Sequence, residues 1–244
     1  MVEHRIYTRS AMNDITFETA DNEPDQHQVQ SPYLMMVQSV SHELRSVFGI
    51  ISGMHSLLPL ASGEDERRDM FHRLQNNTEY AAQLFTALED YCAMETGPVQ
   101  VESSSFRPAG ALEYIRKKAQ PMLERRRASL TLDGDREMRV DGDEEKVQCI
   151  VRNLVFHLAG VARVRDIAVT WGQSAHSWHV NVNYLGEPLP AWLFYAGDQS
   201  YDESIGSHVG LLIVRRLVSV LGGKIREMPV ETPGRRGIAL HFPL

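Results

Sequence analysis

Two long stretches of apolar residues, spaced alternately three and four positions apart, set the first constraint on this chain. They cover residues 37–58 and 70–91. Such spacing places the apolar side chains on one stripe of a helix, as in a coiled coil. Pro59 and Gly63 interrupt the pattern between the two stretches and predict a turn. The sequence therefore predicts an antiparallel helical hairpin.

A lone hairpin would leave part of both stripes exposed to water. The usual solution is that two hairpins from two chains pair into a four-helix bundle, so we expect a homodimer. An antiparallel hairpin with some other packing partner is the alternative that spacing alone leaves open.

His42 falls between the apolar positions Val40 and Leu44 of the first predicted helix. A histidine on an apolar helix is more commonly a packed core residue, but this register directs the imidazole to solvent. Glu43 follows directly and can accept a proton or hold the ring in one tautomer. The pattern therefore indicates an exposed nucleophile.

Length and charge limit what the rest of the chain can be. The 244 residues suffice for the hairpin and one further domain of about 140 residues. No segment approaches the ~20 apolar residues of a membrane span, and the N-terminus lacks the apolar run of a signal peptide, so we expect a cytoplasmic protein without membrane contact. A formal net charge of -7 argues against nucleic-acid binding. Cys92 and Cys149 lack metal or disulfide spacing, which predicts reduced thiols packed as small groups and no metal site.

Three regions are expected along the chain. Residues 1–31 are polar and predict a flexible tail, residues 32–97 form the hairpin, and residues 98–244 form the second domain. In the second domain, helical patterns alternate with extended ones. Helices are expected over 109–127, 144–162 and 210–221, and strands over 130–132, 139–140, 167–171, 178–182, 224–228 and 237–242. The order predicts helices on one face of a mixed sheet, and an α + α/β sandwich for the whole chain.

Residues 41–46 read Ser-His-Glu-Leu-Arg-Ser and resemble the phosphoacceptor box of bacterial sensor histidine kinases. The hairpin is similar to the dimerisation and phosphotransfer domain of those kinases. The second domain resembles their ATP-binding domain, which is related to gyrase and the Hsp90 chaperones. There, residues 147–154 are similar to the lead-in of the asparagine box, and residues 206–214 look like the second glycine box. The resemblance covers residues 32–244.

The resemblance implies a role for each residue of the phosphoacceptor box. His42 would accept a phosphoryl group, and Glu43 would orient or deprotonate its ring. Arg45 would screen phosphoryl charge, and Ser46 could position water for hydrolysis. Val47 stands where the family usually has proline, so we expect a weaker helical bend there.

The nucleotide-binding residues that the resemblance implies depart from the family's pattern. His157 replaces an asparagine that holds Mg²⁺, and imidazole is a poor ligand for a hard cation. Tyr184 replaces the carboxylate that accepts the adenine amino hydrogen, and His208 replaces a glycine that lets backbone amides approach the phosphates. We expect a degenerate nucleotide site that binds neither ATP nor Mg²⁺ productively, comprising Asn153, His157, Tyr184, Gly186, Gly206 and Gly210.

An intact phosphoacceptor box beside an eroded nucleotide site predicts a dimeric histidine phosphotransfer protein of two-component signalling. His42 would exchange a phosphoryl group with aspartates of response-regulator receiver domains, which bring their own Mg²⁺. An upstream hybrid histidine kinase is a further expected partner. Two alternatives stay open: a sensor-less cytoplasmic histidine kinase with a divergent ATP site, and a pseudokinase scaffold that binds a receiver or kinase and transfers nothing.

Overall fold

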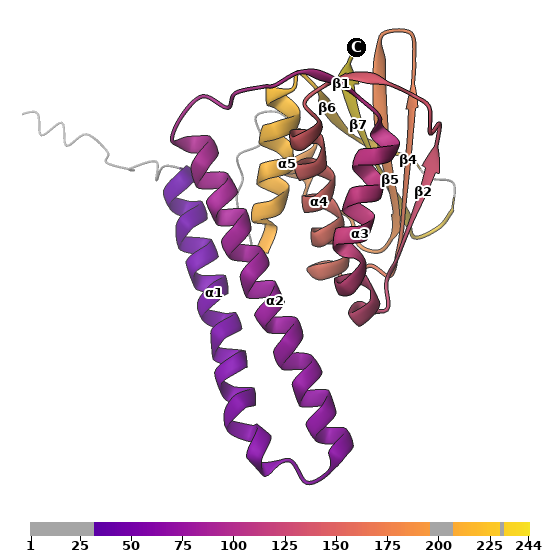
Figure 1. Cartoon of the computed structure of the whole chain (residues 1–244). Helices are drawn as coiled ribbons and strands as arrows, with labels where there is room; N and C mark the ends of the chain where they lie inside the picture. The colour runs from indigo at the N-terminus through magenta and orange to yellow at the C-terminus, as the bar shows by residue number, and fades with distance from the viewer. Residues whose placement is uncertain (1–31, 196–206, 230–231) are drawn as a thin grey trace, which may run out of the picture. The chain divides into compact units, whose positions relative to one another are not determined.

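The computed structural model describes residues 32–195, 207–229 and 232–244 (Figure 1). The predicted N-terminal tail lies outside the described residues, and so does Gly206. Residues 31–244 form one compact unit, in which the hairpin packs on the remainder of the chain.

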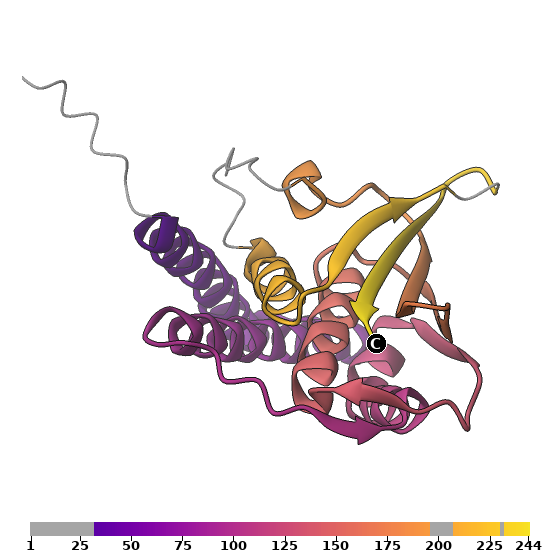
Figure 2. The same cartoon turned by 90° about the horizontal axis from the view of Figure 1, so that it is seen from above.

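Helices α1 (Pro32–Leu57) and α2 (Glu64–Glu95) form the hairpin, with the short 3-10 helix η1 (Leu58–Leu60) between them. They lie side by side in both views (Figures 1 and 2). Three acidic residues in the first turn of α2 favour its start, because carboxylates stabilise the positive end of the helix dipole. The two apolar stripes face each other, and their buried members are Val40, Leu44, Val47, Ala81, Leu84 and Ala87.

A mixed five-stranded sheet forms the second half of the chain, in the spatial order β2-β4-β5-β7-β6. The edge strand β2 (Ser129–Gly134) is parallel to β4 (Asp166–Gln173). All other neighbours are antiparallel, namely β5 (Ser177–Leu185), β7 (Arg235–Pro243) and β6 (Lys224–Met228). Along β4 and β5, buried and half-buried residues alternate, as the sequence pattern predicts.

Helices α3 (Pro108–Arg126), α4 (Glu144–Gly160) and α5 (Val209–Val220) cover one face of this sheet. In both figures they lie between the sheet and the hairpin. Asp143 starts α4, since its Oδ1 accepts a hydrogen bond from the Lys146 backbone N–H at 3.0 Å. The expected α+β architecture, with helices on one face of a mixed sheet, is confirmed.

One strand was not expected from the sequence. Residues 104–106 read only as the lead-in to a helix, but they form β1 (Ser104–Phe106), which pairs antiparallel with β3 (Val140–Gly142). Three residues are too few to show an alternating pattern. Phe106 explains the position of the strand, because its ring is buried edge-on against Trp178 with 5.9 Å between ring centroids.

Candidate functional site

His42 lies on the exposed face of α1. Its neighbours Val40 and Leu44 are buried against α2, and this orients the intervening turn with the imidazole outward. Arg45 and Ser46 are exposed as well. Because Ser46 comes one helical turn after His42, its hydroxyl lies on the same face as the imidazole.

Glu43 turns toward α2 rather than toward His42. Successive residues on a helix are rotated by about 100°, so Glu43 lies on the flank next to the hairpin partner. It is half-buried, and its Oε1 accepts a hydrogen bond of 3.0 Å from the Tyr80 hydroxyl of α2. Among the described residues, no hydrogen bond joins Glu43 to His42. The sequence pattern did not indicate Tyr80, since this residue precedes the striped residue Ala81 and belongs to no motif.

The exposed face of α1 continues beyond Ser46 with very small residues. Gly49 and Gly53 lie seven and eleven positions after His42, which keeps them on its face of the helix. A Cβ atom added at either glycine would meet nothing within 4 Å. The positions of Gly49 and Gly53 therefore leave open space on the His42 face of α1.

At the candidate nucleotide site, two of the departures from the family pattern contact each other. The His157 side chain projects from α4 and is 5 % exposed. Its ring centroid lies 5.0 Å from that of His208, which in turn lies 6.4 Å from the Trp192 ring in the 3-10 helix η2 (Ala191–Leu193). Burial, together with the nearby His208, lowers the pKa of His157 to about 3. The imidazole is therefore neutral at physiological pH.

The other residues predicted for that site have packing roles. Asn153 donates from Nδ2 to the Cys149 carbonyl oxygen at 2.8 Å, one turn earlier on α4. Gly210 allows α5 to approach, because a Cβ there would lie 3.1 Å from Asn153 Oδ1. Tyr184 is fully buried on β5, and a Cβ at Gly186 would meet Val164 Cγ2 at 3.2 Å. The structure brings Asn153, His157 and Gly210 together, while Tyr184 and Gly186 lie at the end of β5.

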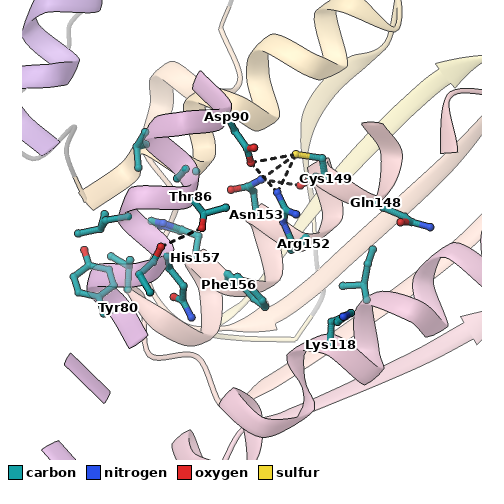
Figure 3. Close-up of a pocket in the computed structure, with 18 of the residues that line it drawn as sticks. Tyr80, Thr86, Asp90, Lys118, Gln148, Cys149, Arg152, Asn153, Phe156 and His157 are labelled. Atoms are coloured by element: carbon teal, nitrogen blue, oxygen red, sulfur yellow. Dashed lines mark hydrogen bonds and ion pairs between the residues drawn. The ribbon is translucent and has the colours of Figure 1, made fainter. Parts of the chain in front are cut away.

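A cavity of about 720 Å³ lies between α2, α3, α4 and the start of α5 (Figure 3). Asp90 reaches into it from α2 and accepts a hydrogen bond from Arg152 of α4 at 2.8 Å. The Cys149 thiol lies 3.9 Å from the same carboxylate oxygen. Burial raises the pKa of the Asp90 carboxyl, whereas Arg152 opposes that shift. This ion pair and its counterpart between Arg125 of α3 and Glu79 of α2 join the hairpin to the second half of the chain.

Cys149 is a free thiol that packs against the hydrophobic core, as expected, but it also has polar neighbours. Its Sγ accepts contacts from Arg152 at 3.3 Å and Asn153 at 3.4 Å, so the thiol belongs to a polar cluster. Burial raises its pKa and keeps it protonated, which disfavours reactivity.

Within the described residues, no group of three or more histidine, cysteine, aspartate or glutamate side chains could hold a metal ion. No helix in the described part of the chain is long and apolar enough to cross a membrane.

No protein-family model matches the chain. Among curated proteins, it is 23% identical over 228 residues to Histidine kinase 5 of Arabidopsis thaliana, with 78% of this chain and 24% of that protein covered. It is 25% identical over 204 residues to the phosphate regulon sensor protein PhoR of Pseudomonas aeruginosa, with 79% and 46% covered. The chain is histidine kinase-like. It spans less than half the length of either relative.

Solved structures share the fold of this histidine kinase-like chain. The Acinetobacter baumannii histidine kinase AdeS superposes with a TM-score of 0.58 at 16% identity, covering 83% of this chain and 97% of that one. The histidine kinase ThkA, solved in complex with the response regulator protein TrrA, superposes with a TM-score of 0.61 at 19% identity, covering 85% and 60%.

Proposed function

We propose that this chain is a two-component signalling protein in which His42 carries a phosphoryl group between receiver-domain aspartates. The observation that carries the proposal is the exposed imidazole of His42 on α1, followed by a glutamate whose carboxylate is fixed across the hairpin. Such a site needs little else, since a receiver supplies its own acidic residues and Mg²⁺.

The transfer step is a simple displacement. A nitrogen lone pair of His42 attacks phosphorus, the P–O bond to the receiver aspartate breaks, and a P–N bond forms. The proton on the other ring nitrogen then leaves to a base, for which Glu43 is the nearest carboxylate in sequence. Arg45, exposed on the next turn, can screen the phosphoryl charge, and Ser46 can position a hydrolytic water.

The side chains packed at the end of α4 favour a phosphoryl-transfer function that does not use ATP. The rings of His157 and His208 lie against each other where the family resemblance assigns magnesium and phosphate contacts. The buried neutral imidazole of His157, with the His208 ring against it, does not fit a hard cation and a polyphosphate. Kinase activity is the second candidate, because Histidine kinase 5, AdeS and ThkA are all named as histidine kinases and fit that function equally well.

Receiver domains are the proposed partners. ThkA was solved with a response regulator, and a matching protein of Dictyostelium discoideum is called the hybrid signal transduction protein dokA. In this chain, Gly49, Ile50 and Gly53 are exposed on α1 next to His42, and the two glycines leave open space between the larger side chains. We propose this face as the receiver-docking surface, and an upstream hybrid histidine kinase as the source of phosphoryl groups.

A homodimer is proposed from the hairpin's outer surface. Leu34 and Phe48 lie fourteen residues apart on α1, and Phe71 and Phe85 do so on α2, so each pair shares one helix face. These four side chains are between 45% and 55% exposed. A second copy of the hairpin would cover them and complete a four-helix bundle.

The deciding experiment is phosphoryl transfer from a ³²P-labelled receiver domain. The unmodified protein should take up acid-labile, alkali-stable label, and His42→Gln should take up none. His55→Gln is the matched control, because His55 is exposed on the same helix and lacks a following carboxylate. Tight receiver binding without label in the unmodified protein would favour the scaffold alternative.

A calorimetric titration with Mg-ATP separates transfer from kinase activity. We expect no saturable heat at micromolar concentrations of nucleotide. Micromolar affinity together with autophosphorylation of His42 would replace the transfer proposal with the kinase alternative.

A further inference from the structure

Tyr80 connects the cavity region of α2 to the residue beside His42. Its hydroxyl donates a hydrogen bond of 3.0 Å to Glu43 Oε1, and 37 residues separate the two in sequence. Tyr80 also lines the cavity, where Figure 3 shows it at the opposite end from Asp90. The hairpin fold alone brings this hydroxyl to Glu43.

The surroundings of Tyr80 keep its hydroxyl a donor. Burial raises the pKa of Tyr80 well above its ordinary value, with the Glu43 carboxylate adding to the shift and Arg126 of α3 opposing it. The phenol is therefore protonated throughout the physiological range, and a carboxylate is its matching acceptor.

The end of α3 packs against α2 at this turn. Arg125 Nε donates to the Glu79 carboxylate at 3.0 Å, and Arg126 donates to the Gly160 carbonyl oxygen at the end of α4 at 2.9 Å. The residue preceding Tyr80 is thus tied to the second half of the chain. An ordered Tyr80 can in turn hold Glu43 in one rotamer, which a free glutamate with three rotatable bonds would not keep.

We infer that Tyr80 is a positioning residue for phosphoryl transfer at His42, because it holds one carboxylate oxygen of Glu43, the residue beside His42, while the other oxygen has no hydrogen bond among the described residues. This inference rests on the proposed function. It also gives the kinase-like second half of the chain a role that needs no nucleotide, because the end of α3 supports the turn that carries Tyr80.

Tyr80→Phe tests the inference because it removes only the hydroxyl oxygen. At saturating labelled receiver, the rate of transfer to His42 should fall about tenfold, a fraction of what a positioned proton acceptor provides. The dissociation constant for unphosphorylated receiver should change by less than about twofold, since Tyr80 is not on the His42 face. Tyr114→Phe, at an exposed tyrosine of α3, is the matched control and should transfer at the unmodified rate.

A double-mutant cycle locates the effect at Glu43. In a Glu43→Gln background, Tyr80→Phe should cause no further loss of rate, because the two residues act through one hydrogen bond. If Tyr80→Phe slowed transfer by the same factor in the unmodified protein and in the Glu43→Gln background, the inference would be overturned.

An NMR titration tests the Tyr80–Glu43 hydrogen bond without requiring phosphoryl transfer. With ¹³Cζ-labelled tyrosine, the Tyr80 resonance should titrate above the ordinary tyrosine pKa of about 10, and Glu43→Gln should lower that midpoint. An unmodified rate in Tyr80→Phe, or a Tyr80 midpoint insensitive to Glu43→Gln, overturns the inference alone. Absence of label in the unmodified protein overturns the proposed function and this inference together.

Discussion

Individual histidines in this chain have opposite environments, and these environments determine what each can do. His42 is exposed and available to a partner, while His157 is buried against His208. An exposed imidazole can meet a partner's reacting group, whereas a buried one resists protonation because charge is costly away from water. The same residue type thus serves as a candidate nucleophile on α1 and as packing on α4.

His157 should make the protein acid-sensitive. Its pKa is about 3 in the folded chain and 6.5 in the reference state, so the unfolded state binds the proton first as pH falls. The stability associated with the neutral ring is therefore lost progressively below about pH 6.5. From about pH 7 to about pH 5, we expect the free energy of unfolding to drop by about 2 kcal/mol. Urea titrations at several pH values measure this free energy of unfolding.

His157→Asn is the control for this acid sensitivity. The variant lacks the titrating ring, so its free energy of unfolding should show little of the expected drop of about 2 kcal/mol between about pH 7 and about pH 5. Identical pH profiles for the two proteins would contradict the assignment to His157.

His42→Ala should separate chemistry from folding. The side chain is exposed, so the free energy of unfolding should change by no more than about 0.5 kcal/mol, while phosphoryl acceptance should be abolished. Leu44→Ala, two residues later and buried, should instead cost about 2–5 kcal/mol. Denaturant unfolding and label uptake are measured on the same preparations. Comparable destabilisation by both substitutions would refute the exposure of His42.

At the scale of elements, α1 has two faces with different uses. The buried stripe packs on α2, and the opposite face presents His42 with small residues after it. The open space at Gly49 and Gly53 lets a partner approach this face of the helix closely.

Gly53→Arg should block the approach of a receiver without altering His42. The position has open space around it, so the arginine is accommodated, and replacing a helical glycine costs no helix stability. We expect transfer from a phosphorylated receiver to fall at least about tenfold, since a bulky charge sits within the contact face. Labelling by phosphoramidate, a small donor, should be unaffected.

Gly53→Ala is the matched control and should transfer normally. Unchanged transfer from the receiver to Gly53→Arg would show that this face of α1 is not where the receiver docks.

At the scale of the whole molecule, the hairpin belongs to two contact surfaces. One surface contacts α5 and is joined to α3 and α4 by the ion pairs Glu79–Arg125 and Asp90–Arg152. The other carries half-exposed aromatic side chains, including Phe48 and Phe85, whose ring centroids are 6.4 Å apart. An apolar surface of this kind gains stability when a second copy covers it.

Phe71→Glu should convert the proposed dimer into a folded monomer. Because Phe71 is 55% exposed in the single chain, a charge there costs little within one protomer but opposes burial between two. Leu84→Asp, at a buried position, should instead unfold the chain. Multi-angle light scattering and circular dichroism distinguish the two outcomes. A folded monomer in the unmodified protein would refute the dimer.

Local sequence determined the elements and the direction of His42. The three- and four-residue spacing predicted α1 and α2, and strict alternation predicted β4 and β5, because side-chain direction repeats with the period of each backbone. The same register predicted that the His42 ring faces away from the stripe. Side-chain periodicity did not predict the short strand β1, because its position depends on the burial of Phe106 and on pairing with β3.

Only tertiary structure decided how the functional side chains are partnered. Tyr80 meets Glu43 across 37 residues, and Arg152 meets Asp90 across 62. His157 of α4 and His208, which immediately precedes α5, come together in the fold. No local period encodes such contacts, because they arise where separate elements pack and a buried polar group must find a partner. The sequence therefore pointed to the residue on which the chemistry is proposed, and the fold supplied the neighbours that position it.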